Sequence, residues 1–129
     1  MARELDKDQL IREMAVGKYP TVEIKAGKFK EPFIIKYLSG DEMSAVGRKL
    51  SEYFGGQNLE SIPAENYYTA KQGMYLNFAV KEYPKDFEGV WKKEDFINYP
   101  DMEVKNELFK SFNTFFIEVQ NTLSGNKSK

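Results

Sequence analysis

The sequence predicts an α+β fold, in which an N-terminal helix and a β-hairpin pack with about three further helices in a single domain. Two neighbouring stretches near residue 30 alternate apolar and polar side chains, as strands do. Four other stretches repeat apolar side chains at steps of three and four, as helices do. The predicted strands therefore lie together rather than between helices, which is typical of α+β proteins. The 129 residues suit one domain, which we place at 1–125, followed by a flexible polar tail at 126–129.

The first predicted element is a short helix over residues 5–16. Leu10, Ile11 and Met14 recur at helical spacing and form a single apolar stripe. Acidic side chains near the start complement the positive end of the helix dipole. Gly17 then ends the helix.

A β-hairpin is predicted next. Residues 21–25 form its first strand, 26–28 a glycine-containing connection, and 29–38 its return strand. Pro32 cannot donate a ladder hydrogen bond, so we expect it at an edge or a bulge. Two strands alone are marginally stable in water, so the hairpin needs a helix or another chain against it. Its apolar face comprises Val22, Ile24, Phe33, Ile35 and Tyr37.

Residues 39–54 carry a strong helix signal. Ser39 and Glu42 have the spacing of a capping box, in which each side chain bonds the other residue's backbone N–H. Two glycines after residue 54 supply a left-handed helix end. The apolar side chains at helical steps are Met43, Val46, Leu50, Tyr53 and Phe54.

A further helix is predicted from Pro63, in its first turn, to about Lys81. Gly73 lies in its middle, where glycine costs about 1 kcal/mol relative to alanine unless it permits close packing. The turn-rich residues 83–100 follow, with one helical turn expected over 93–97. Their apolar anchors are Phe87, Val90, Trp91, Phe96 and Ile97.

The last predicted helix begins after the capping residue Asp101 and ends at Gly125. A long apolar stripe runs along it, which predicts a helix packed along its length on the core. The stripe comprises Val104, Leu108, Phe112, Phe115 or Phe116, Val119 and Leu123.

Composition limits the chemistry that the chain could perform. Because it has no His and no Cys, it lacks imidazole bases, thiolate nucleophiles and the usual zinc ligands. The close acidic pairs, Asp41–Glu42 and Glu94–Asp95, are explained by a helix start and a solvated charge run. We therefore expect no enzyme, no cofactor and no metal. The charged N-terminus and the short apolar runs predict neither a secretory signal nor a membrane span.

The predicted hairpin is rich in lysine and could track a nucleic acid strand by charge and stacking. The candidate residues are Lys25, Lys28, Lys30 and Phe29. The alternative, which we favour, is a solvated strand surface whose lysines discourage edge-to-edge aggregation. A net charge of −1 gives no general attraction to nucleic acid.

Aromatic side chains are concentrated on the two later helices and cannot all share one narrow helix face. Either these helices are buried on two sides, or some of their aromatic side chains form an exposed patch for a partner. The candidates for partner binding are Tyr67, Tyr68, Tyr75, Phe109 and Phe116.

The order of elements resembles a known family. A hairpin leads into a capped helix through FIIKYLSGDEMSAVGRKLSEYF (33–54), a middle helix is followed by YPKDFEGVWKKEDFINYPD (83–101), and the closing helix ends in FFIEVQNTLSG (115–125). Over residues 20–125 this resembles the tail assembly chaperones of long-tailed bacteriophages and prophages. Residues 5–16 lie outside the resemblance.

The resemblance implies a non-enzymatic protein of the host bacterial cytoplasm that is absent from the finished virion. Its expected partners are the helical tape measure protein and copies of itself, with the major tail protein as a further candidate. Many family members also have a longer, frameshifted form. A structural tail or head–tail connector protein is the alternative from the same setting, and a nucleic-acid-binding accessory protein is a third.

Overall fold

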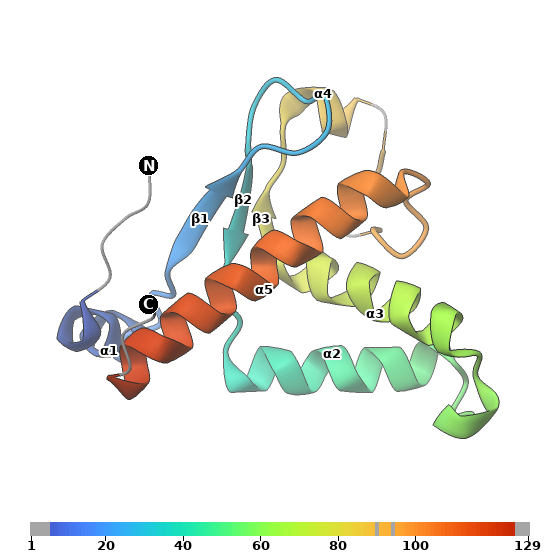
Figure 1. The fold of residues 1–129 in the computed structure, drawn as a ribbon, viewed down its shortest axis with the longest axis horizontal. Helices are drawn as coiled ribbons and strands as arrows, with labels where there is room; N and C mark the ends of the chain where they lie inside the picture. Colours follow the sequence, from blue (N-terminus) through green and yellow to red (C-terminus); the bar gives the residue numbers. More distant parts are fainter. Residues whose placement is uncertain (1–5, 90, 94, 126–129) are drawn as a thin grey trace.

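A computed structural model describes residues 6–89, 91–93 and 95–125 of the chain and confirms the α+β class (Figure 1). Long helices dominate, and a small sheet lies behind the longest of them (Figure 1). The elements in chain order are α1 (Lys7–Ala15), β1 (Thr21–Ile24), β2 (Phe33–Lys36), α2 (Gly40–Tyr53), the 3-10 turn η1 (Leu59–Ser61), α3 (Ala64–Ala79), β3 (Val80–Glu82), α4 (Lys85–Glu88) and α5 (Met102–Ser124).

The predicted hairpin is confirmed as the antiparallel pair β1–β2. Its connection, residues 25–32, is longer than the expected turn, and Pro32 lies in this connection just before β2. Val22 pairs with Ile35 and Ile24 pairs with Phe33, so the predicted apolar face is one continuous surface. Phe33 and Ile35 are fully buried on this face.

The third strand, β3, corrects the prediction that α3 continues to about Lys81. Val80 adopts extended backbone angles, and β3 pairs antiparallel with β2, with a bulge between Ile34 and Ile35. A strand of three residues is too short to show whether its side chains follow the strand or the helix period. The helical pattern of the preceding residues was therefore extended into it. The sheet order among the described residues is β1-β2-β3.

The capping box of α2 forms as predicted. The Ser39 hydroxyl accepts a hydrogen bond from the Glu42 N–H at 3.2 Å, and the Glu42 carboxylate accepts one from the Ser39 N–H at 3.0 Å. The Lys36 ammonium, at the end of β2, donates to the same carboxylate at 2.5 Å. This cluster fixes the angle at which the sheet leads into α2.

Replacing Glu42 by Gln should make the stability of α2 less dependent on acid pH. Burial acts to raise the pKa of Glu42, but the hydrogen bonds from Lys36 and Ser39 and the Lys36 charge outweigh it, so the pKa lies below 4.5. The carboxylate therefore stabilises the fold above pH 4.5, and this contribution is lost as pH falls through the lowered pKa.

The variant should cost about 0.5 kcal/mol at neutral pH, since Gln keeps the cap but not the ion pair. Urea unfolding at neutral and acid pH measures the difference from the natural protein, which should shrink on acidification. A difference that stays constant with pH would contradict the assignment.

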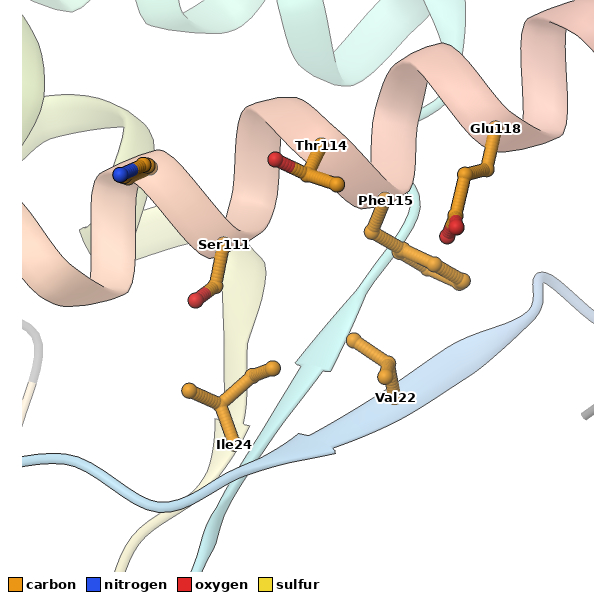
Figure 2. A pocket seen from close by; sticks show the side chains of 7 residues that line it. Val22, Ile24, Ser111, Thr114, Phe115 and Glu118 are labelled. Atoms are coloured by element: carbon orange, nitrogen blue, oxygen red, sulfur yellow. The ribbon is translucent and has the colours of Figure 1, made fainter. Parts of the chain in front are cut away.

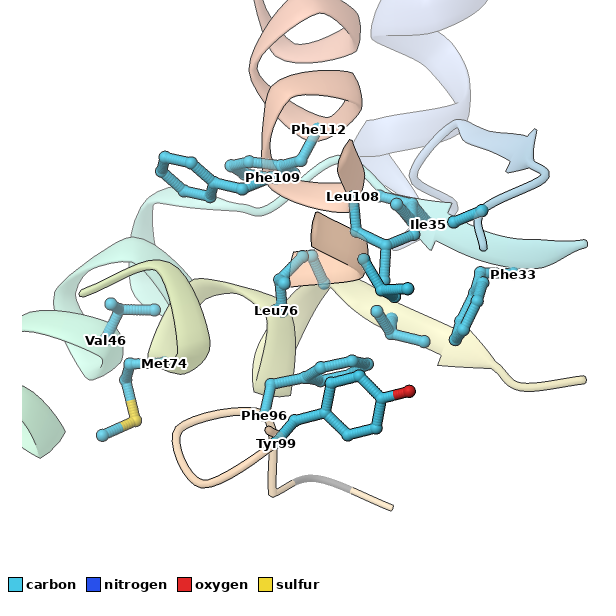
Figure 3. Packing of buried hydrophobic residues seen from close by; sticks show 14 of the residues in the cluster. Phe33, Ile35, Val46, Met74, Leu76, Phe96, Tyr99, Leu108, Phe109 and Phe112 are labelled. Carbon is cyan, nitrogen blue, oxygen red and sulfur yellow. The ribbon is translucent and has the colours of Figure 1, made fainter. Parts of the chain in front are cut away.

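The core lies between the sheet and α5, and α3 lies beneath the first half of α5 (Figures 1 and 3). The stripe predicted on α5 is confirmed, because Leu108 and Val119 are fully buried and Phe112 is 2% exposed. Asp101 caps the helix, and Gly125 ends it at a φ of 81°. The tail predicted at 126–129 lies outside the described residues.

At its other end α5 contacts α1 around a small second cluster that includes Leu10, Tyr37 and Val119. The stripe predicted on α1 is wrong in one member, because Ile11 is 48% exposed. Leu10 alone of α1 is fully buried, and Met14 packs at the cluster's edge. Residue 5, the predicted start of this helix, lies outside the described residues.

The segment 83–100 is anchored by aromatic side chains. Phe87 and Phe96 are buried, while Trp91 and Ile97 are half-buried. Val90 lies outside the described residues. The helical turn predicted at 93–97 is wrong, because the described residues there are not helical and the turn is α4, earlier in the segment.

Candidate protein-binding surface

α3 packs against both α2 and α5, and aromatic side chains gather along these three helices. Six of those that keep exposed surface make up what we call the aromatic face. Tyr53 and Tyr68 are 53% and 54% exposed, and the others are half-buried. The aromatic face comprises Tyr53, Phe54, Tyr67, Tyr68, Tyr75 and Phe116.

Ring contacts hold the aromatic face in place. Phe54, at the end of α2, stacks on Tyr67 with ring centroids 5.9 Å apart, and Tyr53 meets Phe54 edge-on at 5.0 Å. Tyr68 meets Phe109 edge-on at 6.2 Å. Side chains held in this way lose little conformational entropy when a partner covers them, which favours binding.

Phe109 supports the aromatic face rather than forming part of it. This ring is only 7% exposed and lies between Tyr68 and Tyr75, so it is part of the core. Of the five residues predicted to bind a partner, Phe109 is buried, as expected if the helix is covered on two sides. The other four keep exposed surface. Burial and the charge of the neighbouring Tyr67 raise the pKa of Tyr75, which keeps this phenol neutral.

Phe116 extends the aromatic face toward the sheet. Its ring stacks on Tyr37 with centroids 4.8 Å apart and an interplanar angle of 13°. The hydroxyl of Tyr37 accepts a hydrogen bond from the Gln120 amide, so Tyr37 holds α5 at two points.

Neither Tyr53 nor Phe54 was predicted as a site residue. Their adjacency was the available signal, because two neighbours on a helix cannot both face one core.

The lysine-rich connection does not offer its aromatic ring for stacking. Phe29 packs edge-on against Phe33 and Phe87, at 5.6 and 5.4 Å. Lys25 donates through Nζ to the carbonyl of Lys30 at 2.7 Å. Lys28 and Lys30 are exposed.

Acidic side chains also reach this connection. The backbone N–H of Gly27 donates to Glu107 at 3.2 Å, and that of Lys30 donates to Asp86 at 3.2 Å. Positive charge here is therefore interleaved with negative charge, which weakens the case for a nucleic acid surface.

Lys105 and the close acidic pairs are the other candidates for a chemical role. Lys105 is 1% exposed, donates to the carbonyl of Ile97 at 3.2 Å, and has its pKa lowered by burial against an opposing effect of Asp95. Its amine anchors a loop and is closed to solvent. Asp41 lies in the first turn of α2, as a helix start predicts. Glu94 of the other acidic pair lies outside the described residues.

No group of acidic side chains within the described residues could hold a metal ion. None of the helices in that part of the chain has the length and apolar character needed to cross a membrane. Comparisons with protein-family models, curated proteins and solved structures found no match to the chain. The surface itself is therefore what bears on function.

Proposed function

We propose that this chain is a non-enzymatic tail assembly chaperone of the long-tailed phage type, which holds the helical tape measure protein on its aromatic face. The observation that carries the proposal is the set of aromatic side chains on α2, α3 and α5 that keep exposed surface and are linked by ring contacts. The element order that resembles this family supports the same assignment.

The physical case begins with the kind of client. An amphipathic helix binds a partner by laying its apolar side chains against an apolar surface. Tyrosine and phenylalanine suit that surface, because they bury a large area with few rotatable bonds, and the tyrosine hydroxyls remain hydrated. Charged side chains such as Glu42, Asp101 and Lys105 serve a cap, an ion pair or a loop anchor, so binding accounts for the exposed surface better than catalysis does.

In this proposal the chain works in the host bacterial cytoplasm while the tail is assembled, and it is absent from the finished particle. Copies of the chain associate on the client, and the major tail protein is a further candidate partner. Mass spectrometry of purified particles distinguishes this role from that of a structural tail or connector protein, which would be present in them.

Replacing Tyr53 and Tyr68 together by Ser should release the client. Both side chains are more than half exposed, so the change should leave the fold intact. Each anchor contributes about 1–2 kcal/mol in a typical interface, so losing both should lower the affinity by roughly thirtyfold to several hundredfold. The measurement is the soluble fraction of a co-expressed tape measure protein.

The matched control replaces Val16 and Ile117 by Ser. These side chains are 73% and 57% exposed but lie outside the aromatic face. The control should keep the client soluble as the natural protein does. If the tyrosine variant also does so, the aromatic face is not the binding site. If the natural protein fails to keep the client soluble, the proposed function is wrong.

A further inference from the structure

A pocket of about 230 Å³ lies between β1 and α5 (Figure 2). None of the residues that line it belongs to the aromatic face. Val22 and Ile24 point up from β1 toward Phe115 and Ser111, which point down from the helix (Figure 2). No lining residue comes from β2 or β3, so the pocket is at the outer edge of the sheet.

β1 is an edge strand, so some of its backbone N–H and C=O groups face away from the rest of the sheet. The Tyr37 N–H donates to the carbonyl of Pro20 at 2.9 Å, which fixes the phase of the β1–β2 ladder. In that phase Val22 and Ile24 bond to β2, whereas Thr21 and Glu23 turn their N–H and C=O groups outward. Within the described residues no strand pairs with this edge.

Two opposite charges lie at the ends of the pocket. Lys110 and Glu118 are both exposed and both line it, and they are separated by two turns of α5. Their side chains form no hydrogen bond or ion pair with any other described residue. The pocket therefore has an apolar floor, a basic end and an acidic end.

We propose that this pocket and edge bind an extended peptide segment of another protein, which pairs antiparallel with β1 as a fourth strand. The three side chains that it turns toward α5 are acidic, apolar and basic, in that order. The ligand is extended rather than helical, so this site goes beyond the proposed chaperone function and does not depend on it.

The repeat distances support this pattern. Eight residues of helix rise about 12 Å, and four residues of strand span about 13 Å. Side chains at positions i and i+4 of the added strand can therefore reach Lys110 and Glu118. The chain direction of β1 is opposite to that of α5, because Ile24 lies under Ser111 and Val22 under Phe115 (Figure 2). A strand antiparallel to β1 thus brings its acidic residue to Lys110 first and its apolar residue to Val22 and Phe115.

The probe is a synthetic peptide, acetyl-TETVTKT-amide, titrated into the isotope-labelled full chain to about 1 mM, the range expected for a small interface. Amide NMR signals of residues 21–24 should shift. The control peptide, acetyl-TKTVTET-amide, has the same composition with the charges exchanged, and it should bind about tenfold more weakly.

Two variants test the two parts of the site. Lys110→Glu combined with Glu118→Lys should reverse the preference between the peptides. Glu23→Pro removes an outward N–H without removing a bond to β2, so binding should fall at least about tenfold while the sheet is kept. Glu23→Ala keeps the N–H and should bind the peptide normally.

Equal binding of the two peptides, shifts outside β1 and α5, or no binding at the highest concentration would overturn the proposal. A concentration-dependent dimer in sedimentation that Glu23→Pro dissolves would also overturn it, and would assign the edge to a second copy of the chain. The chaperone proposal fails separately, in the tape measure experiment.

Discussion

Replacing Gly73 by Ala should destabilise the fold by about 3 kcal/mol, at the upper end of what overpacking costs. A Cβ atom at this position would lie 2.5 Å from the Cα of Ile97 and 2.6 Å from its N. Both atoms belong to the backbone of a loop that hydrogen bonds hold in place. The carbonyl of Ile97 accepts from Lys105, and the N–H of the neighbouring Phe96 donates to Asn77 at 2.7 Å. The loop cannot move aside without breaking these bonds. Urea unfolding measures the loss in the free energy of unfolding, and the m-value of the variant should equal that of the natural protein.

The matched control is Gly47→Ala on α2. Gly47 is also helical, but an added Cβ would meet no atom within 4 Å. Only helix propensity then changes, so this variant should be more stable by up to about 1 kcal/mol. If the two substitutions have the same sign, the contact between α3 and Ile97 is not the reason for glycine at position 73.

Gly73 illustrates how far the sequence could be interpreted. Two roles were open for it, a weak point in the helix or a close approach, and only the position of Ile97 decides between them. The contact joins residues distant in sequence, and local patterns carry no information about such pairs. Signals within one turn were more reliable: the caps at Ser39 and Asp101 form as their spacing predicts.

The sheet shows the same division. β1 and β2 each have a pattern of alternation that predicts their shared apolar face. β3 has three residues, too few for any period, and becomes a strand because β2 offers it a free edge. Tertiary pairing therefore decides this segment.

The aromatic face was predicted in part. Tyr67, Tyr68, Tyr75 and Phe116 keep exposed surface, but Phe109 does not. Phe109 and Phe116 occupy one flank of α5, so the helical period could not separate them. Their neighbours do: Tyr68 and Tyr75 cover Phe109.

Replacing Phe87 by Ala should cost about 3–5 kcal/mol, the usual range for a phenylalanine removed from a core. Phe87 is fully buried, and its ring centroid lies 5.4 Å from that of Phe33 on β2, 5.5 Å from that of Phe96 and 5.3 Å from that of Tyr99. It thus joins the segment 83–100 to the sheet. Phe87→Leu fills most of the space, so it should cost less, about 1.5 kcal/mol or below.

Hydrogen exchange of the Phe96 and Tyr99 amides shows whether this join makes one cooperative unit. Both amides donate within the described structure, Phe96 to Asn77 and Tyr99 to the carbonyl of Phe96. If the segment unfolds together with the sheet, Phe87→Ala should lower their protection by the same free energy as it lowers global stability. Protection lost at these amides with global stability unchanged would show that the segment opens on its own. In that case Gly73→Ala should also destabilise the fold by less than about 3 kcal/mol, because the loop could open and move Ile97 away from the added methyl group.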